Sequence, residues 1–225
     1  MQKRKTISQR SELIYDIHNF GINADTRELF INPDNGAEYD NAEIDHRVAS
    51  MLIKNIRFLD SFKLDPIVIH MCSCGGIWEY GLAIYDAIMS TKSEVYIVAY
   101  AHARSMSSII LQAGDYRILS PNAYFMIHTG TDSYHGTTQG LITHAQQAQK
   151  SCEKMLDIYV DSCAEGPYFK QKKNSVAQIR TFLKKQMNKH QEWYMLAEEA
   201  VEYGFCDYIL GDSKCPDIGK IINPA

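Results

Sequence analysis

The chain has 225 residues, of which 45% are hydrophobic and 22% are charged, and its formal net charge is -4. That length suits one sizeable domain with its own hydrophobic core, and the composition is typical of a folded, soluble protein. The slightly acidic charge argues against nucleic acid as a main partner, and no segment approaches the roughly 18 consecutive apolar residues of a membrane span.

The N-terminal region predicts a cytoplasmic protein. Residues 1–5 are basic, but residues 6–12 are polar where a signal peptide needs an apolar run. We expect a single domain over residues 1–225, in which residues 1–25 form a flexible N-terminal segment.

The six cysteines are expected to be free thiols, because a chain of this size in a reducing compartment does not need disulfide bonds. Cys72 and Cys74 are close in sequence, but no second Cys or His pair has the spacing of a zinc site. We therefore expect no metal ion.

The first half of the chain alternates between strand and helix patterns. A strand is expected over residues 28–31, a turn with an Asn-Gly pair at 32–36, and an amphipathic helix over 44–59. A continuous apolar run at 67–71 predicts a buried strand, followed by a turn and a helix over 81–88. Residues 95–100 repeat the strand pattern, and another helix begins near Ser105. This alternation predicts an α/β fold with parallel strands joined by crossover helices.

The second half predicts two short strands, at 117–119 and 124–127, and then a Gly- and Thr-rich loop at 129–140. The long helix that follows has an apolar stripe that packs either on its own core or on another subunit. The lysine-rich residues 169–190 are interpreted as a solvated helical face rather than a nucleic-acid contact. A helix at 197–203 ends at Gly204, before a last strand at 205–210 and a polar end.

Three turns follow expected strands and carry residue types that suit a catalytic site. They contain Gly75 and Gly76, then Ser105, then His128. Because the carboxyl ends of parallel strands meet at one edge of a sheet, we expect the three turns to lie together. A serine hydroxyl, a histidine base and glycine N–H groups suit nucleophilic catalysis. By position alone, Ser105 also fits an ordinary helix N-cap.

The same segments resemble the Clp protease proteolytic subunit (ClpP) family. Arg104-Ser105-Met106 is similar to the family's nucleophile segment, and Pro121-Asn122 followed by Met126-Ile127-His128 is similar to its histidine segment. The late run Ala-Glu-Glu-Ala-Val-Glu-Tyr-Gly at 197–204 and the glycine pair with its following helix complete the resemblance, which covers roughly residues 67–210.

The resemblance implies site residues. Ser105 would be the nucleophile, His128 the general base, and the N–H groups of Gly76 and Met106 the oxyanion hole. Counting back from the late helix places the third triad member at Glu192.

Three departures from the family pattern leave alternatives open. Glu192 stands where the family has aspartate and also fits a solvated glutamate at a helix start; Asp157 and Asp161 are poorer candidates for the same role. Arg104 precedes the serine in place of a small residue, and Cys74 replaces the usual proline of the glycine turn.

The resemblance also implies a function and an assembly. The chain would be a serine endopeptidase that cleaves unfolded polypeptides through an acyl-enzyme and needs no cofactor. Its fold would be a ClpP/crotonase-like spiral of β-β-α units, with a protruding handle helix near residues 140–163. Seven copies of the chain would form a homo-oligomeric ring, and two such heptameric rings would pair into a closed chamber. An AAA+ unfoldase of the Clp type would feed substrates into this chamber. The unfoldase, and not this chain, would bind ATP, because this chain has no Walker loop.

Two other classes of protein remain open. A catalytically impaired ClpP-like ring or scaffold subunit would explain the three departures. A crotonase-type acyl-CoA enzyme would share the general fold but would not need Ser105, whereas a Ser-Lys dyad peptidase lacks a lysine in these motifs.

Overall fold

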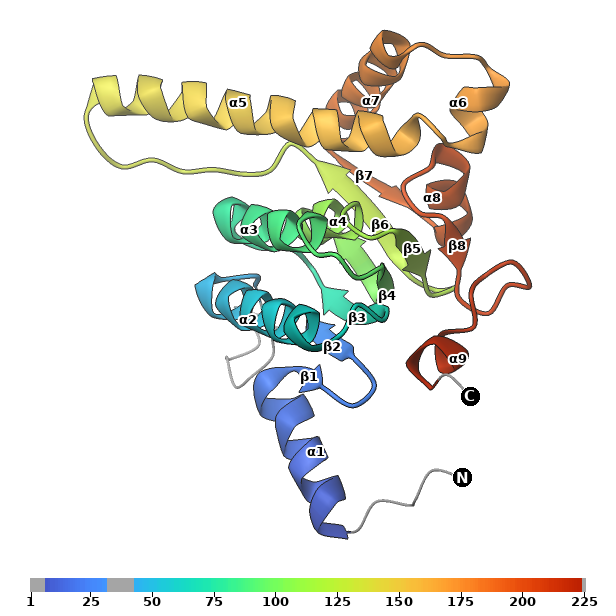
Figure 1. Cartoon of the computed structure of the whole chain (residues 1–225). Coiled ribbons are helices and arrows are strands. Elements are labelled where there is room, and N and C mark those ends of the chain that lie inside the picture. The colour runs from blue at the N-terminus through green and yellow to red at the C-terminus, as the bar shows by residue number, and fades with distance from the viewer. Residues whose placement is uncertain (1–6, 32–42, 224–225) are drawn as a thin grey trace.

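The computed structural model describes residues 7–31 and 43–223. The helices are α1 (Ile7–Phe20), α2 (His46–Phe62), α3 (Trp78–Met89), α4 (Met106–Leu111), α5 (Thr138–Cys163), α6 (Pro167–Gln171), α7 (Val176–His190), α8 (Ala197–Tyr203) and α9 (Ile218–Ile222). The strands are β1 (Ile22–Asn23), β2 (Glu28–Ile31), β3 (Ile67–Ser73), β4 (Val95–Arg104), β5 (Tyr116–Leu119), β6 (Tyr124–His128), β7 (Glu192–Met195) and β8 (Tyr208–Ile209). Figure 1 shows their arrangement.

The described strands form one mixed sheet dominated by parallel pairs, which confirms the expected α/β class. Along its main path the order is β1-β2-β3-β4-β5-β8, in which β2 to β5 and β8 are parallel and β1 is antiparallel to β2. Helix α2 connects β2 to β3, and α3 connects β3 to β4, as crossover connections require.

Strand β4 bends and thereby gives the sheet a second branch. Its first half pairs with β5, whereas its last three residues pair with β6, which in turn holds β7 antiparallel. Between the two halves Ala101 has a φ of 55°, and the register against β3 shifts beyond Met71. The bend brings the end of β4 beside β6, so that Ser105, directly after β4, lies near His128, the last residue of β6.

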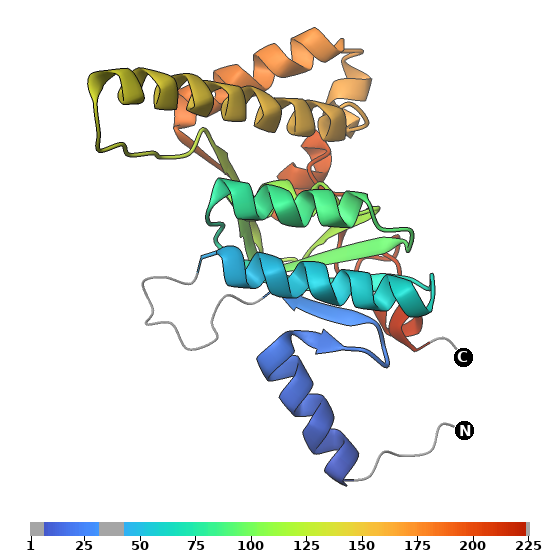
Figure 2. The same cartoon turned by 60° about the vertical axis from the view of Figure 1, so that its left-hand side comes forward.

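Apolar side chains cover the sheet on both faces. The larger core lies between the sheet and α2, α3 and α4, and includes Leu52, Ile69 and Ile84. On the other face, Val98 and Ile118 pack with residues of α9. Helices α5, α6 and α7 lie together at the end of the molecule beyond β6 and β7 (Figures 1 and 2).

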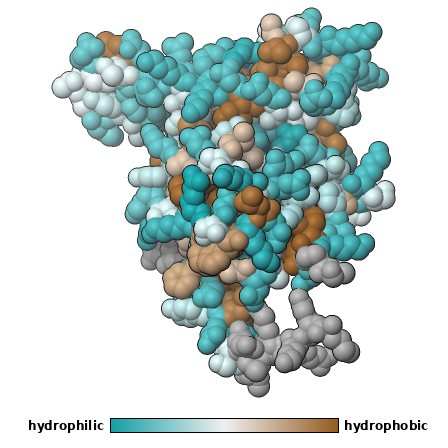
Figure 3. All heavy atoms as spheres, in the orientation of Figure 1, coloured by the Kyte–Doolittle hydropathy of each residue, from teal (hydrophilic) through white to brown (hydrophobic). Residues whose placement is uncertain are grey.

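Helix α5 is buried only near its C-terminal end. Its buried residues run from Met155 to Cys163, whereas Leu141 and Ile142 are 52% and 48% exposed. The N-terminal turns extend away from the sheet (Figures 1 and 2), and hydrophilic side chains cover most of their surface in Figure 3.

Several elements differ from the sequence-based expectations. The described part of segment 1–25 forms α1 and β1, while the flexibility expected of this segment stays a prediction; the polar C-terminal end contains α9. Strand β4 continues four residues beyond the expected end, and β8 has only two residues. The turn expected at 32–36 lies outside the described residues. Across the described ranges, every helix is too short or too polar to cross a lipid bilayer.

Candidate active site

Ser105 occupies a sharp turn between β4 and α4. Its φ of 51° and ψ of -125° belong to a backbone conformation that residues other than glycine rarely adopt. The Ser105 N–H donates to the carbonyl of Met126 (3.0 Å), and the Ser105 carbonyl accepts from the N–H and hydroxyl of Ser108. The side chain makes no helix-capping bond. A strained strand-to-helix turn of this kind exposes a nucleophile, as in hydrolases of other folds.

His128 ends β6 and directs its ring at Ser105. Its Nε2 lies 2.7 Å from Ser105 Oγ. Burial lowers the pKa of His128, and the negative charge of Glu192 opposes this by raising it. Because the net shift is downward, the imidazole is neutral near pH 7, and Nε2 can accept the hydrogen bond from the serine hydroxyl.

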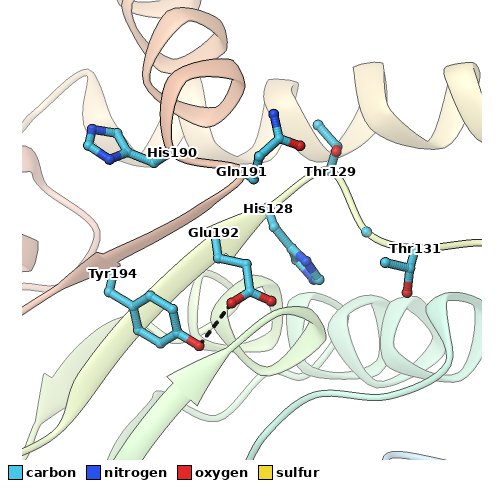
Figure 4. A pocket seen from close by; sticks show the side chains of 8 residues that line it. His128, Thr129, Thr131, His190, Gln191, Glu192 and Tyr194 are labelled. Carbon is cyan, nitrogen blue, oxygen red and sulfur yellow. Dashed lines mark hydrogen bonds between the residues drawn. The ribbon is translucent and has the colours of Figure 1, made fainter.

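Glu192 lies in β7 and not at a helix start. Strand β7 pairs antiparallel with β6, and Glu192 is the direct register partner of His128. The two side chains therefore point the same way from neighbouring strands (Figure 4). The hydroxyl of Tyr194 donates to Glu192 Oε2 (3.2 Å), but no hydrogen bond joins Glu192 to His128 within the described residues. Of the two alternatives on α5, Asp157 forms an ion pair with Arg180 of α7.

The turn after β3 fits only glycine. Gly75 has a φ of 116°, and a Cβ there would lie 2.7 Å from Ser105 Cβ and 3.0 Å from the Met106 nitrogen. Gly76 has a φ of 153°, and a Cβ there would overlap the main chain of Ile44. Two backbone hydrogen bonds with Ile44 hold the turn in place. The Ile44 N–H donates to the Gly75 carbonyl, and the Ile44 carbonyl accepts from the Ile77 N–H, both at 2.9 Å.

Two N–H groups, one in the glycine turn and one directly after Ser105, lack acceptors in the described part of the chain. Neither the N–H of Gly76 nor that of Met106 donates a hydrogen bond to any part of the chain that the structure describes. Unpaired N–H groups near a nucleophile can receive an oxyanion.

A cavity of about 500 Å³ opens next to His128 (Figure 4). It is lined by His128, Thr129, Gly130, Thr131, His190, Gln191, Glu192 and Tyr194. Sequence reasoning had selected only His128 and Glu192 among these. The others follow β6, lie at the end of α7 or directly after it, or belong to β7, so only the pairing of β6 with β7 reveals them as one group.

The residues that depart from the family pattern have identifiable contacts. The Arg104 guanidinium lies 5.4 Å from the centre of the Tyr194 ring, a cation–π distance. Cys74 Sγ lies 3.2 Å from Nε2 of His102. Among the described residues, no three His, Cys, Asp or Glu side chains gather as metal ligands do.

Comparison with known proteins identifies the family. The family model for Clp protease matches residues 39–213. The ATP-dependent Clp protease proteolytic subunit of Deinococcus radiodurans is 28% identical over 174 residues, which cover 76% of this chain and 78% of that protein. Because the match extends over most of the chain, from before the glycine turn to beyond β8, the protein belongs to the Clp protease family and is a peptidase of the ClpP type.

Proposed function

We propose that this chain is a serine endopeptidase that cleaves unfolded polypeptides through an acyl-enzyme on Ser105. The hydrogen bond of 2.7 Å between Ser105 Oγ and His128 Nε2, at a strained turn, is the observation that carries the proposal. A peptide bond that reaches this turn would meet a hydroxyl and its base already in contact.

In the proposed mechanism, His128 accepts the Ser105 proton while Oγ attacks the scissile carbonyl carbon. The N–H groups of Gly76 and Met106 would stabilise the oxyanion, each contributing about 3 kcal/mol. His128 would then protonate the leaving amine and activate the water that releases the acyl group.

Glu192 would stabilise the imidazolium form of His128 through charge. The support is its register position opposite His128 and its effect on the pKa of that ring. A carboxylate in this role remains ionised while the histidine takes the proton. Tyr194, which donates to the carboxylate, would hold it in place.

The proposal extends to the assembly. The relative from Deinococcus radiodurans is named as an ATP-dependent proteolytic subunit. By analogy, this chain would form homo-oligomeric heptameric rings that pair into a chamber in the cytoplasm. An AAA+ Clp-type unfoldase would be its partner, and α5 would be the handle helix. The exposed Leu141 and Ile142 on the projecting part of α5 would suit a contact between rings. The spiral of β-β-α units belongs to the same proposal.

A fluorophosphonate probe tests the proposed function. We expect one adduct, located on Ser105 by peptide mass spectrometry, and loss of both labelling and peptide hydrolysis in Ser105→Ala. Ser133→Ala, a change in an exposed loop, is the matched control and should keep both. Hydrolysis that survives Ser105→Ala would refute the serine mechanism.

A catalytically impaired ring subunit is the second candidate. The missing hydrogen bond between Glu192 and His128 favours it, since a triad normally fixes its histidine through that bond. An assembled particle in which Ser105 resists the probe would support this alternative over the peptidase.

A further inference from the structure

A second pair of reactive side chains lies beside the candidate site. Cys74 follows β3, directly before the glycine pair, and its side chain is exposed. Its Sγ lies 3.2 Å from Nε2 of His102, a half-buried residue in the last part of β4. The pairing of Ser73 with Ala103 in neighbouring strands accounts for this contact.

His102 can accept a proton from the thiol. Burial lowers the pKa of His102, and the positive charge of Arg104 lowers it further. The imidazole is therefore neutral near pH 7, with a free electron pair for a thiol proton. The contact of 3.2 Å between His102 Nε2 and Cys74 Sγ therefore gives an exposed thiol a base within hydrogen-bond distance.

The other cysteines provide an internal comparison. Cys72 is also exposed and lies only two residues earlier, but within the described residues no hydrogen bond links it to a histidine. Burial raises the pKa of the Cys152, Cys163 and Cys206 thiols, which makes them less reactive.

We propose that Cys74 and His102 form a modification site at which hydroperoxides and alkylating electrophiles react with the Cys74 sulfur. With hydrogen peroxide, His102 takes the thiol proton and the sulfur attacks one peroxide oxygen. An S–O bond forms and the O–O bond breaks, so that sulfur is oxidised to a sulfenic acid and the peroxide is reduced. The second oxygen leaves with the proton as water.

Modification of Cys74 would act on the neighbouring site. Gly75, the next residue, packs against Ser105 with no room for a Cβ, and Gly76 follows with its unpaired N–H. A group added to Cys74 would displace His102 or the turn, and so lower the reactivity of Ser105. This consequence rests on the proposed function, whereas the reactivity of the thiol does not.

Alkylation by iodoacetamide at pH 7, followed by peptide mass spectrometry on the full-length protein, tests the site itself. We expect Cys74 to react at least about tenfold faster than Cys72. His102→Asn should slow Cys74 to the rate of Cys72, while buried Cys206 reports any unfolding. With peroxide, a dimedone adduct should appear on Cys74 first. Equal rates at Cys74 and Cys72 in the unaltered protein would overturn the proposal.

Fluorophosphonate labelling of Ser105 tests the consequence. In the unaltered protein, prior alkylation should slow the labelling of Ser105 several-fold. In Cys74→Ser, the alkylated and the non-alkylated protein should be labelled at the same rate. If Ser105 is not labelled even before alkylation, the proposed function fails, and the thiol proposal is judged by the alkylation rates alone. Labelling that is equally fast before and after alkylation would disprove the link between the two sites.

Discussion

Two features of the structure act in opposite directions on the pKa of His128. Burial lowers its pKa, and the carboxylate of Glu192 on the neighbouring strand raises it. The Tyr194 hydroxyl, rather than His128, donates the hydrogen bond that holds this carboxylate. Glu192 therefore acts on His128 through charge, and its effect should be visible in the pH dependence of the reaction.

Glu192→Gln should lower the pKa of His128 further, because it removes the charge that favours the protonated ring while burial remains. A base works only when it is neutral, so the acidic limb of the pH profile of kcat/KM should move to lower pH. The maximal rate should fall, by about tenfold for each pKa unit of stabilisation that the imidazolium formed during reaction loses. Profiles with a fluorogenic peptide measure both effects.

Glu198→Gln, on the exposed first turn of α8, is the matched control and should change neither quantity. An acidic limb that stays in place in Glu192→Gln would mean that Glu192 does not act on His128.

How far the site could be predicted differs from residue to residue. Ser105 follows β4 and His128 ends β6, and because the carboxyl ends of these parallel strands share an edge, their closeness is expected from the parallel arrangement. The partners of Glu192 could not be derived in this way, because β6 and β7 are separated by more than sixty residues of chain. Nothing in the local pattern indicates which residue of β7 lies opposite His128, so Tyr194 was missed.

At the scale of elements, the bend in β4 decides where the site forms. The expected strand ended at residue 100, whereas the observed strand continues past Ala101 to Arg104. A positive φ at Ala101 turns the strand from β5 towards β6. Local propensity could not reveal this, because alanine and histidine carry no turn signal; the pairing with β6 imposes the conformation. Strand β7 was missed for a similar reason, since its four residues acquire their alternation of exposed and buried side chains only against β6.

Replacement of Ala101 tests this bend. Ala101→Val should lower the free energy of unfolding by about 1–2 kcal/mol, because a β-branched side chain tolerates positive φ poorly. Ala101→Gly should be close to neutral, since relief of strain offsets the greater freedom of the unfolded chain. Ala101 is exposed, so neither change disturbs core packing. Urea unfolding measures both, and equal stability of the two variants would show that the bend does not depend on this residue.

At the scale of the whole molecule, one polar network ties the first four strands together. Glu28 of β2 accepts from Thr26 and from Asn23 of β1, and its Oε1 lies 3.0 Å from Nε2 of His70 in β3. Nδ1 of His70 lies 3.1 Å from the hydroxyl of Tyr100 in β4. The network therefore crosses the sheet from the edge strand β1 to β4 in its parallel part.

Glu28 should make the stability of the fold depend on pH in the acid range. The hydrogen bond from His70 lowers the pKa of Glu28, with burial opposing it and Thr26 and Asn23 contributing further in the same direction. A carboxyl whose pKa is lower in the folded state stabilises the fold above its unfolded pKa, and this contribution is lost as the pH falls through the folded value. The free energy of unfolding should therefore decrease below about pH 4.5.

Glu28→Gln should remove part of this decrease, because glutamine binds no proton in either state. Urea unfolding of both proteins between pH 3 and pH 7 should give curves that are furthest apart at neutral pH and converge in acid. Burial raises the pKa of Asp60, but its hydrogen bonds lower it more, so the net shift is downward. Because Asp60 is present in both proteins, a smaller decrease of the free energy of unfolding in acid should remain in both. Glu198→Gln, at a site without a hydrogen bond or ion pair in the described ranges, should retain the full slope. Parallel curves for Glu28→Gln and the unaltered protein would show that the Glu28 carboxylate does not couple the pairing of β1, β2 and β3 to pH.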